Sequence, residues 1–278
     1  MSRGDRAEEM ARLRRAVEKI EARSGPAEAR AAPRLSLTPA LDRALGGGLS
    51  GDALHEIAPA SPGDGAAAMG FALALVARFM AARDAAGLVV AEDFALRETG
   101  ALYGPGLVAH GLELGRLVFV RAPDAPALFQ AMEEALRSGA SAVVVGEAWN
   151  LKGYDLSVSR RLLLAARAGA TPALLVHASA YGAAEKLSSA AETRFAIAAA
   201  PSARLTSAGG GRALPGPPAF AARLVKARLT SAQGPQSLDA TKIFRLTWRS
   251  EDQRFDEPTL SLPVAAASGD RPRAKPAR

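Results

Sequence analysis

The side chains that most often carry catalysis are few and scattered in this sequence. The histidines His55, His110 and His177 follow no metal-ligand spacing, so we expect core or surface residues and no metal site. Glu133 and Glu134 are adjacent in a predicted helix, where neighbouring positions point in different directions, so they form no carboxylate dyad. The chain contains no cysteine, which excludes thiolate nucleophiles, thiolate metal sites and disulfides. These residue types therefore predict no catalytic constellation.

The composition is that of a protein with a sizeable core and a basic surface. Of the 278 residues, 49% are hydrophobic and 5% aromatic, and the formal net charge is +7. The charge has two interpretations: an arginine-rich composition typical of a high-GC genome, or a surface that binds polyanions or acidic proteins. Residues 1–15 are charged throughout and precede no apolar segment, so we expect no secretory signal. The longest apolar run, residues 66–77, is shorter than the roughly 20 residues of a membrane helix, so we expect a cytoplasmic protein without membrane contact.

From Leu35 onward the hydrophobic pattern predicts strands that alternate with helices. Strands are predicted at residues 53–58, 87–91, 116–121, 142–146 and 171–177, and helices at residues 65–85, 94–103, 126–138 and 157–168. Strands that are buried on both faces and joined by helices indicate a mostly parallel sheet. Residues 190–199, 219–230 and 241–250 instead alternate apolar and polar side chains between Gly/Pro turns, which is typical of antiparallel strands. We therefore expect an α/β fold whose mostly parallel sheet ends in antiparallel C-terminal strands.

Two terminal segments differ from this core, which we place at residues 35–252. Residues 1–34 combine a charged helix with a linker that begins at Ser24. The apolar residues of that helix form one narrow stripe, which either docks on a partner chain or lies over its own domain. The stripe comprises Met10, Leu13, Val17 and Ile20. Residues 253–278 end in a basic, proline-bearing tail that we expect to be disordered.

Short motifs between residues 35 and 248 resemble the core of RecA. Leu-Asp-Arg-Ala-Leu-Gly-Gly-Gly-Leu at residues 41–49, followed by Gly51 and by His-Glu-Ile at residues 55–57, is similar to the segment that precedes the RecA phosphate loop. Four later segments are similar, in the same order, to the RecA segments with the catalytic glutamate, the Walker B strand, the next strand and a late basic strand. These are residues 91–96, 140–146, 174–177 and 223–228. The resemblance implies a RecA-like fold with an N-terminal helix.

Within that superfamily the chain resembles the ImuA family most. The motif at residues 41–49, Ala-Leu-His-Glu-Ile at residues 53–57 and Leu-Thr-Trp-Arg at residues 246–249 suggest this. The family works beside ImuB, a catalytically inactive homologue of Y-family polymerases, and an error-prone replicative-type DNA polymerase. The resemblance implies a role in the SOS response to DNA damage, in error-prone translesion synthesis. It implies ImuB as the main partner, RecA, the polymerase and DNA as further candidate partners, and a place at the nucleoid when the protein is induced.

The position of the RecA phosphate loop lacks the side chains that bind ATP–Mg²⁺. Such a loop needs glycine N–H groups aimed at the phosphates, a lysine on the phosphates and a hydroxyl on the metal. Here the lysine position falls on Gly65 or Ala66, the hydroxyl position falls on Ala66 or Ala67, and no lysine lies nearby. Asp64 adds a negative charge, and two prolines in the loop remove N–H donors. The degenerate loop comprises Gly63, Asp64, Gly65 and Ala66, and we expect no cofactor there.

The other catalytic positions of RecA agree with this prediction. The Walker B aspartate position falls on Gly146, with Glu147 beside it. The catalytic glutamate position falls on Asp93, and the phosphate-sensing glutamine position falls near Ala180. Together with the loop, these positions predict a protein that is not an enzyme.

Two basic residues of the late strand match residues that RecA places on the ATP of a neighbouring subunit. Lys226 and Arg228 fall on these positions. In one interpretation they are the solvated edge of an outer strand. In the other, the chain sits against an ATP-loaded RecA subunit and completes its site in trans, with the guanidinium of Arg228 on phosphate oxygens.

The segments that correspond to the DNA-binding loops of RecA are short, at residues 150–154 and 179–184. Each holds one tyrosine that could stack on a base, and basic side chains stand nearby. The alternative is that the tyrosines are simply packed. The candidate DNA residues are Lys152, Tyr154, Arg160, Arg161 and Tyr181.

Three functions follow from these observations. The favoured one is a non-catalytic RecA-like adaptor in DNA damage tolerance. The second is a cell-division inhibitor of the SulA type, which shares a nucleotide-free RecA-like core but is shorter and lacks the late strands and the basic tail. The third is a divergent RecA-type ATPase, which requires tight binding of ATP–Mg²⁺.

Overall fold

The computed structural model describes residues 33–149, 152–182, 186–202, 204–205, 214–228 and 239–257. Its contacts separate two units, and every element below belongs to the second, which starts at Arg34. The expected N-terminal helix, with the stripe of Met10, Leu13, Val17 and Ile20, lies outside the described residues, as does the tail after residue 257.

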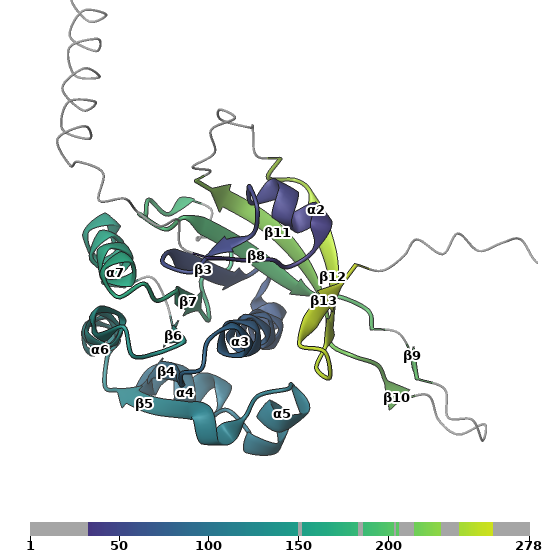
Figure 1. The fold of residues 1–278 in the computed structure, drawn as a ribbon, viewed down its shortest axis with the longest axis horizontal. Helices are drawn as coiled ribbons and strands as arrows, with labels where there is room; N and C mark the ends of the chain where they lie inside the picture. Colours follow the sequence, from purple (N-terminus) through teal and green to yellow (C-terminus); the bar gives the residue numbers. More distant parts are fainter. Residues whose placement is uncertain are drawn as a thin grey trace, which may run out of the picture. The chain divides into compact units, whose positions relative to one another are not determined.

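A nine-stranded sheet forms the centre of this unit, in the order β13-β12-β11-β8-β3-β7-β6-β4-β5 (Figure 1). The six strands from β8 to β5 are parallel. They are β8 (Thr193–Ala199), β3 (Leu54–Pro59), β7 (Ala173–His177), β6 (Val143–Ala148), β4 (Gly87–Glu92) and β5 (Leu117–Ala122). The antiparallel end consists of β11 (Ala219–Ala227), β12 (Ile243–Arg249) and β13 (Arg254–Asp256). The predicted α/β fold, a RecA-like core with antiparallel C-terminal strands, is therefore confirmed.

Helices cover both faces of the sheet. The long helix α3 (Gly65–Ala82) packs on one face, and α6 (Ala125–Ser138) and α7 (Leu156–Ala168) pack side by side on the other (Figure 1). We call these the α3 face and the α6 face. The short helices α2 (Pro39–Ala44), α4 (Asp93–Thr99) and α5 (Gly104–Ala109) belong to the α3 face.

The remaining elements are short. The 3-10 turn η1 (Pro62–Asp64) leads into α3, and η2 (Leu114–Arg116) leads into β5. Two small antiparallel ladders lie outside the main sheet, one of β1 (Arg34–Leu35) with β2 (Leu49–Ser50) and one of β9 (Arg204–Leu205) with β10 (Leu214–Pro215).

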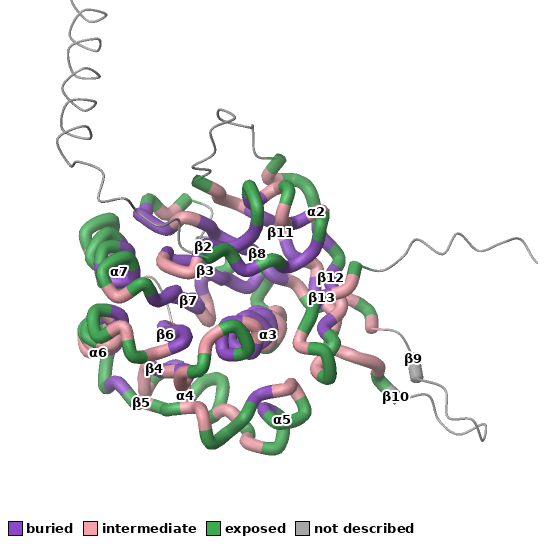
Figure 2. The backbone as a smooth tube through the Cα atoms, viewed as in Figure 1, coloured by how far each residue is buried: buried purple, intermediate pink, exposed green. Residues whose placement is uncertain are grey.

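The sheet divides the core into two apolar clusters, and α3 is the most buried helix (Figure 2). The cluster on the α3 face contains Phe71, Phe195 and Trp248. The segment Pro62–Ala82 is long and apolar enough for a membrane helix, with a mean hydropathy of 1.7, but 61% of this apolar window is buried inside the protein. Apolar residues on all sides are what a helix in the middle of a core requires.

Several predicted boundaries differ from the structure. The helix predicted for residues 94–103 ends at Thr99, because Gly100 adopts a φ of 82° that favours glycine. The Gly-Pro-Gly sequence at residues 104–106 begins α5, because proline is compatible with the first turn of a helix. Strand β8 pairs in parallel with β3 and is antiparallel only to β11. Strand β13 lies beyond the expected end of the core at residue 252.

Candidate functional site

Two backbone donors of the loop between β3 and α3 are bonded within the chain. The N–H of Ala60 donates to the carbonyl of Ile197 on β8 at 2.8 Å, and the N–H of Asp64 donates to the carbonyl of Ser61 at 3.0 Å. Two of the six residues from 59 to 64 are prolines and have no N–H group. A phosphate group would therefore find few of the convergent N–H donors that such loops provide.

The carboxylate of Asp64 occupies the start of α3. It accepts a hydrogen bond from the hydroxyl of Ser61 at 2.6 Å and one from the N–H of Ala199 at 2.9 Å. Asp64 immediately precedes α3, and although its carboxylate makes no capping hydrogen bond to the helix, it adds a negative charge near the positive end of the α3 dipole. Gly63, Gly65 and Ala66 add no donor side chain to this loop.

Strand β6 points the residue at the Walker B position away from this loop. Gly146 faces α6, and a Cβ atom there would lie 2.2 Å from the Sδ of Met132, so a larger residue would require the Met132 side chain to move. Glu147 instead points to the α3 face, where it lines a cavity of about 190 Å³ between α4 and strands β4 to β6. Burial raises the pKa of Glu147 to about 7, and the hydroxyl of Thr99 opposes this shift from 3.4 Å.

The carboxylates at the end of β4 are also engaged within the chain. Asp93 forms an ion pair of 2.9 Å with Arg121 of β5. Glu92 accepts a hydrogen bond from the N–H of Trp149 at 2.9 Å. Ala180, near the expected glutamine position, is buried. Both carboxylates therefore have partners within the chain.

A buried charge cluster on the α6 face has no counterpart in the predictions. Glu56 and Arg194, on the neighbouring strands β3 and β8, are 0% and 2% exposed. The Nε of Arg194 donates to Oε2 of Glu56 at 2.5 Å, and the hydroxyl of Tyr154 donates to Oε1 at 2.5 Å. Arg194 also donates to the hydroxyl of Ser189 and the carbonyl of Leu187. A charged residue in an otherwise apolar strand is the sequence signal that could have indicated this cluster.

His177 completes the cluster and is fully buried. Its ring centroid lies 4.9 Å from that of Tyr154, and neither ring nitrogen has a hydrogen-bond partner. Burial lowers the pKa of His177 to about 4. Burial opposes ionisation of Glu56, but His177, Arg194 and Tyr154 together outweigh it and hold the pKa of Glu56 below its usual value.

Lys226 and Arg228 lie next to this cluster. The ammonium group of Lys226 donates to the carbonyl of Ser189 at 2.6 Å, and Arg228 donates to the same carbonyl at 3.3 Å. Burial, with the charge of Arg228, lowers the pKa of Lys226 to about 8. Strand β11 lies between β8 and β12, but its pairing with β12 ends at Arg223, and Lys226 is half-buried whereas Arg228 is exposed. Their interpretation as the solvated edge of a strand therefore stays a prediction. Contact with an ATP held by RecA stays a prediction.

The candidate DNA residues occupy different environments. Tyr154 is 4% exposed and bonded to Glu56, so the expectation that it stacks on a base is wrong. Tyr181 is 47% exposed. Arg160 and Lys152 are also exposed, whereas Arg161 is exposed but forms an ion pair with Glu133 of α6. Binding of DNA by these side chains stays a prediction.

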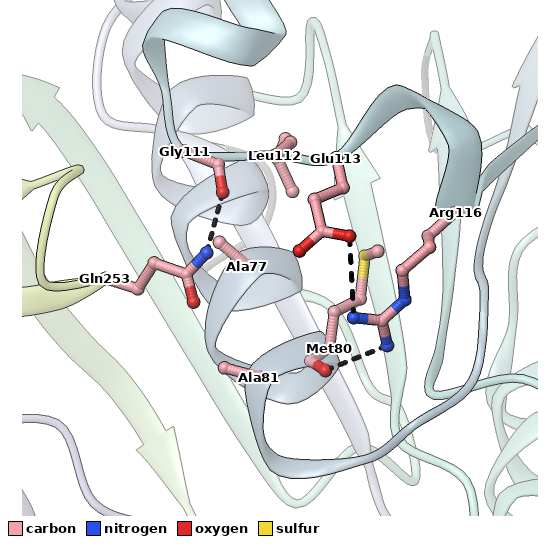
Figure 3. Close-up of a pocket in the computed structure, with 8 residues that line it drawn as sticks. All are labelled: Ala77, Met80, Ala81, Gly111, Leu112, Glu113, Arg116 and Gln253. Carbon is pink, nitrogen blue, oxygen red and sulfur yellow. Dashed lines mark hydrogen bonds and ion pairs between the residues drawn. The ribbon is translucent and has the colours of Figure 1, made fainter.

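A second cavity, at the C-terminal end of α3, measures about 30 Å³, which is room for about one water molecule (Figure 3). Arg116 donates to the carbonyl of Met80 at 3.1 Å and to two further carbonyls just after it, while Gln253 donates to the carbonyl of Gly111 at 2.7 Å. The polar groups around this cavity thus satisfy backbone carbonyls at the end of α3 and in the segment before β5, which is a structural role. Among the residues that the structure describes, no group of three acidic or histidine side chains is arranged to hold a metal ion.

Comparison with known proteins does not identify a family for this chain. No family model matches the sequence, and no curated protein matches it. The solved structures that resemble it include the crystal structure of SulA from Pseudomonas aeruginosa, with 22% sequence identity and a TM-score of 0.36. This likeness covers 45% of the present chain and 96% of SulA, and at this level it adds nothing to the fold described above.

Proposed function

We propose that this chain is a non-catalytic, RecA-like adaptor in SOS-induced, error-prone DNA damage tolerance. The observation that carries the non-catalytic part is the loop before α3. The backbone donors of Ala60 and Asp64 are bonded within the chain, and Asp64 adds a carboxylate immediately before α3. A RecA-like core without nucleotide chemistry leaves the surface as the functional part of the protein, and that supports an adaptor over an ATPase.

The proposed partners follow from the sequence resemblance to the ImuA family. An ImuB-like protein is the main one, and RecA, the error-prone polymerase and DNA are secondary. The apolar stripe from Met10 to Ile20 is the proposed docking segment for ImuB, because a narrow apolar stripe on a charged segment suits a helix-in-groove contact.

The non-catalytic part is tested by equilibrium titration of the purified chain with ATP–Mg²⁺ and by measurement of phosphate release, with RecA as the positive control. We expect no saturable binding at micromolar nucleotide and no hydrolysis. A dissociation constant in the micromolar range would overturn this part of the proposal and favour a divergent ATPase.

The docking segment is tested by pull-down with an ImuB-like protein. We compare the full chain, a chain without residues 1–24, and the substitution Leu13→Asp within the stripe. Arg15→Asp, in the same segment but outside the stripe, is the matched control. We expect the deletion and Leu13→Asp to abolish capture and Arg15→Asp to preserve it. Capture that is indifferent to loss of residues 1–24 would exclude this docking segment.

A further inference from the structure

The outer edge of β5 is open. β5 is the last strand of the sheet, and in the described part of the chain only β4 pairs with it. The ladder with β4 is regular over all six residues, without a bulge, and the strand contains no proline, glycine or lysine. Edge strands are normally protected by bulges, prolines or charged side chains, especially lysine. Without such protection, their free N–H and C=O groups can pair with another strand.

Large apolar side chains flank this open edge on both faces of the sheet. Val118 is 48% and Phe119 49% exposed, although both lie in the middle of the strand. Phe119 pairs with Val89 and points to the α3 face, whereas Val118 and Val120 point to the α6 face. Phe119 also lines the cavity of about 190 Å³ beside α4. Two further large apolar residues are exposed in the neighbouring elements: Phe94 of α4 is 45% exposed, and Leu114 of η2 is 43% exposed.

We propose that β5 pairs with β5 of a second copy of this chain, antiparallel and about a two-fold axis perpendicular to the sheet. The sequence of the strand supports a second copy as the occupant, because Val118, Phe119 and Val120 read the same in both directions. A two-fold contact uses the same surface on both subunits and must therefore be complementary to itself. The proposal rests on the geometry of this edge and is independent of the proposed function.

The pairing register follows from the alternation of side chains. Directly opposite residues of an antiparallel pair point to the same face, so a residue of β5 can oppose itself or a residue two or four positions away. Centring the pair on Phe119 places Phe119 opposite Phe119 and Val118 opposite Val120. Aromatic and β-branched cross-strand pairs are among the stabilising ones. Centring on Val120 would instead place Phe119 opposite Arg121.

The charge at this edge does not oppose the pairing. In the register centred on Phe119, Arg121 lies opposite Leu117 of the second copy and meets no like charge. The guanidinium of Arg121 is held by Asp93 at 2.9 Å within its own chain, so it needs no partner from the other subunit. A single pair of short strands is smaller than a standard interface, so we expect a dissociation constant of about 10 to 100 μM.

Cysteine cross-linking tests the register, and the absence of natural cysteines makes every introduced thiol unique. Directly opposite residues are close enough for a disulfide, whereas diagonal ones are not. A tagged Val118→Cys chain mixed with an untagged Val120→Cys chain should form a mixed disulfide-linked dimer under mild oxidation, and each variant alone should form little. Val108→Cys, at an exposed valine of α5, replaces Val118→Cys as the matched control. A mixed dimer no more abundant than in the control overturns the proposal.

Sedimentation equilibrium of the full chain tests the edge itself. We expect the average mass to rise with concentration from 28.7 kDa towards twice that value. Phe119→Lys should weaken self-association at least about tenfold, because a charge on an edge strand opposes pairing. Ile243→Lys, at an exposed apolar residue of β12, should leave it unchanged. A chain that stays monomeric at about 100 μM, or a dimer that Phe119→Lys does not weaken, overturns the proposal.

Discussion

Replacing Arg194 with methionine removes the positive charge that faces Glu56 inside the core. The two side chains are 3% and 0% exposed, and the Nε of Arg194 lies 2.5 Å from Oε2 of Glu56. The substitution also removes donors to the hydroxyl of Ser189 at 2.8 Å and to the carbonyl of Leu187 at 2.9 Å. Of the donors to the Glu56 carboxylate in the described part of the chain, the hydroxyl of Tyr154 would remain.

The size of the effect follows from this geometry. Methionine fills most of the volume of the arginine stem, so the loss comes from the unpaired carboxylate more than from a cavity. Breaking a buried ion pair on one side lowers the free energy of unfolding by about 3 to 5 kcal/mol. Because a domain has a total of about 5 to 15 kcal/mol, this single change removes a large fraction of the stability.

Urea unfolding followed by circular dichroism measures this loss, with a double-mutant cycle as the control. Glu56→Gln removes the negative charge of the pair, and the double variant buries neither the Glu56 carboxylate nor the Arg194 guanidinium. We expect the double variant to be more stable than the sum of the single losses predicts, by at least about 2 kcal/mol. A loss below about 1 kcal/mol for Arg194→Met, or additive single losses, would show that the pair is not coupled as described.

Three further substitutions have defined outcomes. The pKa of His177 is about 4 in the folded chain, below its ordinary 6.5, so the unfolded chain binds more protons between these pH values and stability falls as the pH drops from 6.5 to 4. His177→Phe should reduce this slope in urea unfolding measured across that range. The pKa of Glu147 is about 7, above its ordinary 4.5, so stability falls as the pH rises through this window. Glu147→Gln should therefore be more stable than the natural chain at pH 8 and not at pH 4. Arg116→Met removes the donor to carbonyls at the end of α3 and should lower the melting temperature, with a loss of about 1 to 3 kcal/mol.

Each of these outcomes can fail in a distinct way. An unchanged slope between pH 4 and 6.5 for His177→Phe would mean that this imidazole is hydrated or bonded in solution. Equal stabilities of Glu147→Gln and the natural chain at pH 8 would mean that the carboxyl group ionises normally in its cavity. Arg116→Lys is the control for the third substitution, because it keeps the charge but not the guanidinium fork.

The features that could be predicted from the sequence are those determined by residue types within one short segment. Strand β6 is apolar throughout its first half, Val143 to Val145, and such a continuous apolar run is typical of a strand that is buried on both faces of a sheet. Residues 59 to 66 contain neither lysine nor a correctly placed hydroxyl, and no fold can supply the missing groups from the loop itself. The α/β order and the degenerate loop were therefore accessible without coordinates.

The features that were not predicted depend on contacts between distant parts of the chain. Glu56 and Arg194 are separated by 138 positions, and nothing local to either residue specifies the other. Tyr154 follows a strand and resembles a loop tyrosine, but its hydroxyl reaches into the core to Glu56. Gly146 and Glu147 are adjacent at the Walker B position of the sequence, but consecutive residues of a strand point to opposite faces. Gly146 therefore faces α6, and Glu147 faces the cavity on the α3 face.

The most direct test of the adaptor proposal is size-exclusion chromatography with light scattering on the purified chain mixed with an ImuB-like protein, with and without ATP–Mg²⁺. The proposal predicts a complex whose mass and yield are the same in both conditions. No complex at all would contradict the proposed partner, and a complex that forms only with ATP–Mg²⁺ would contradict the assignment of the loop before α3 as non-functional.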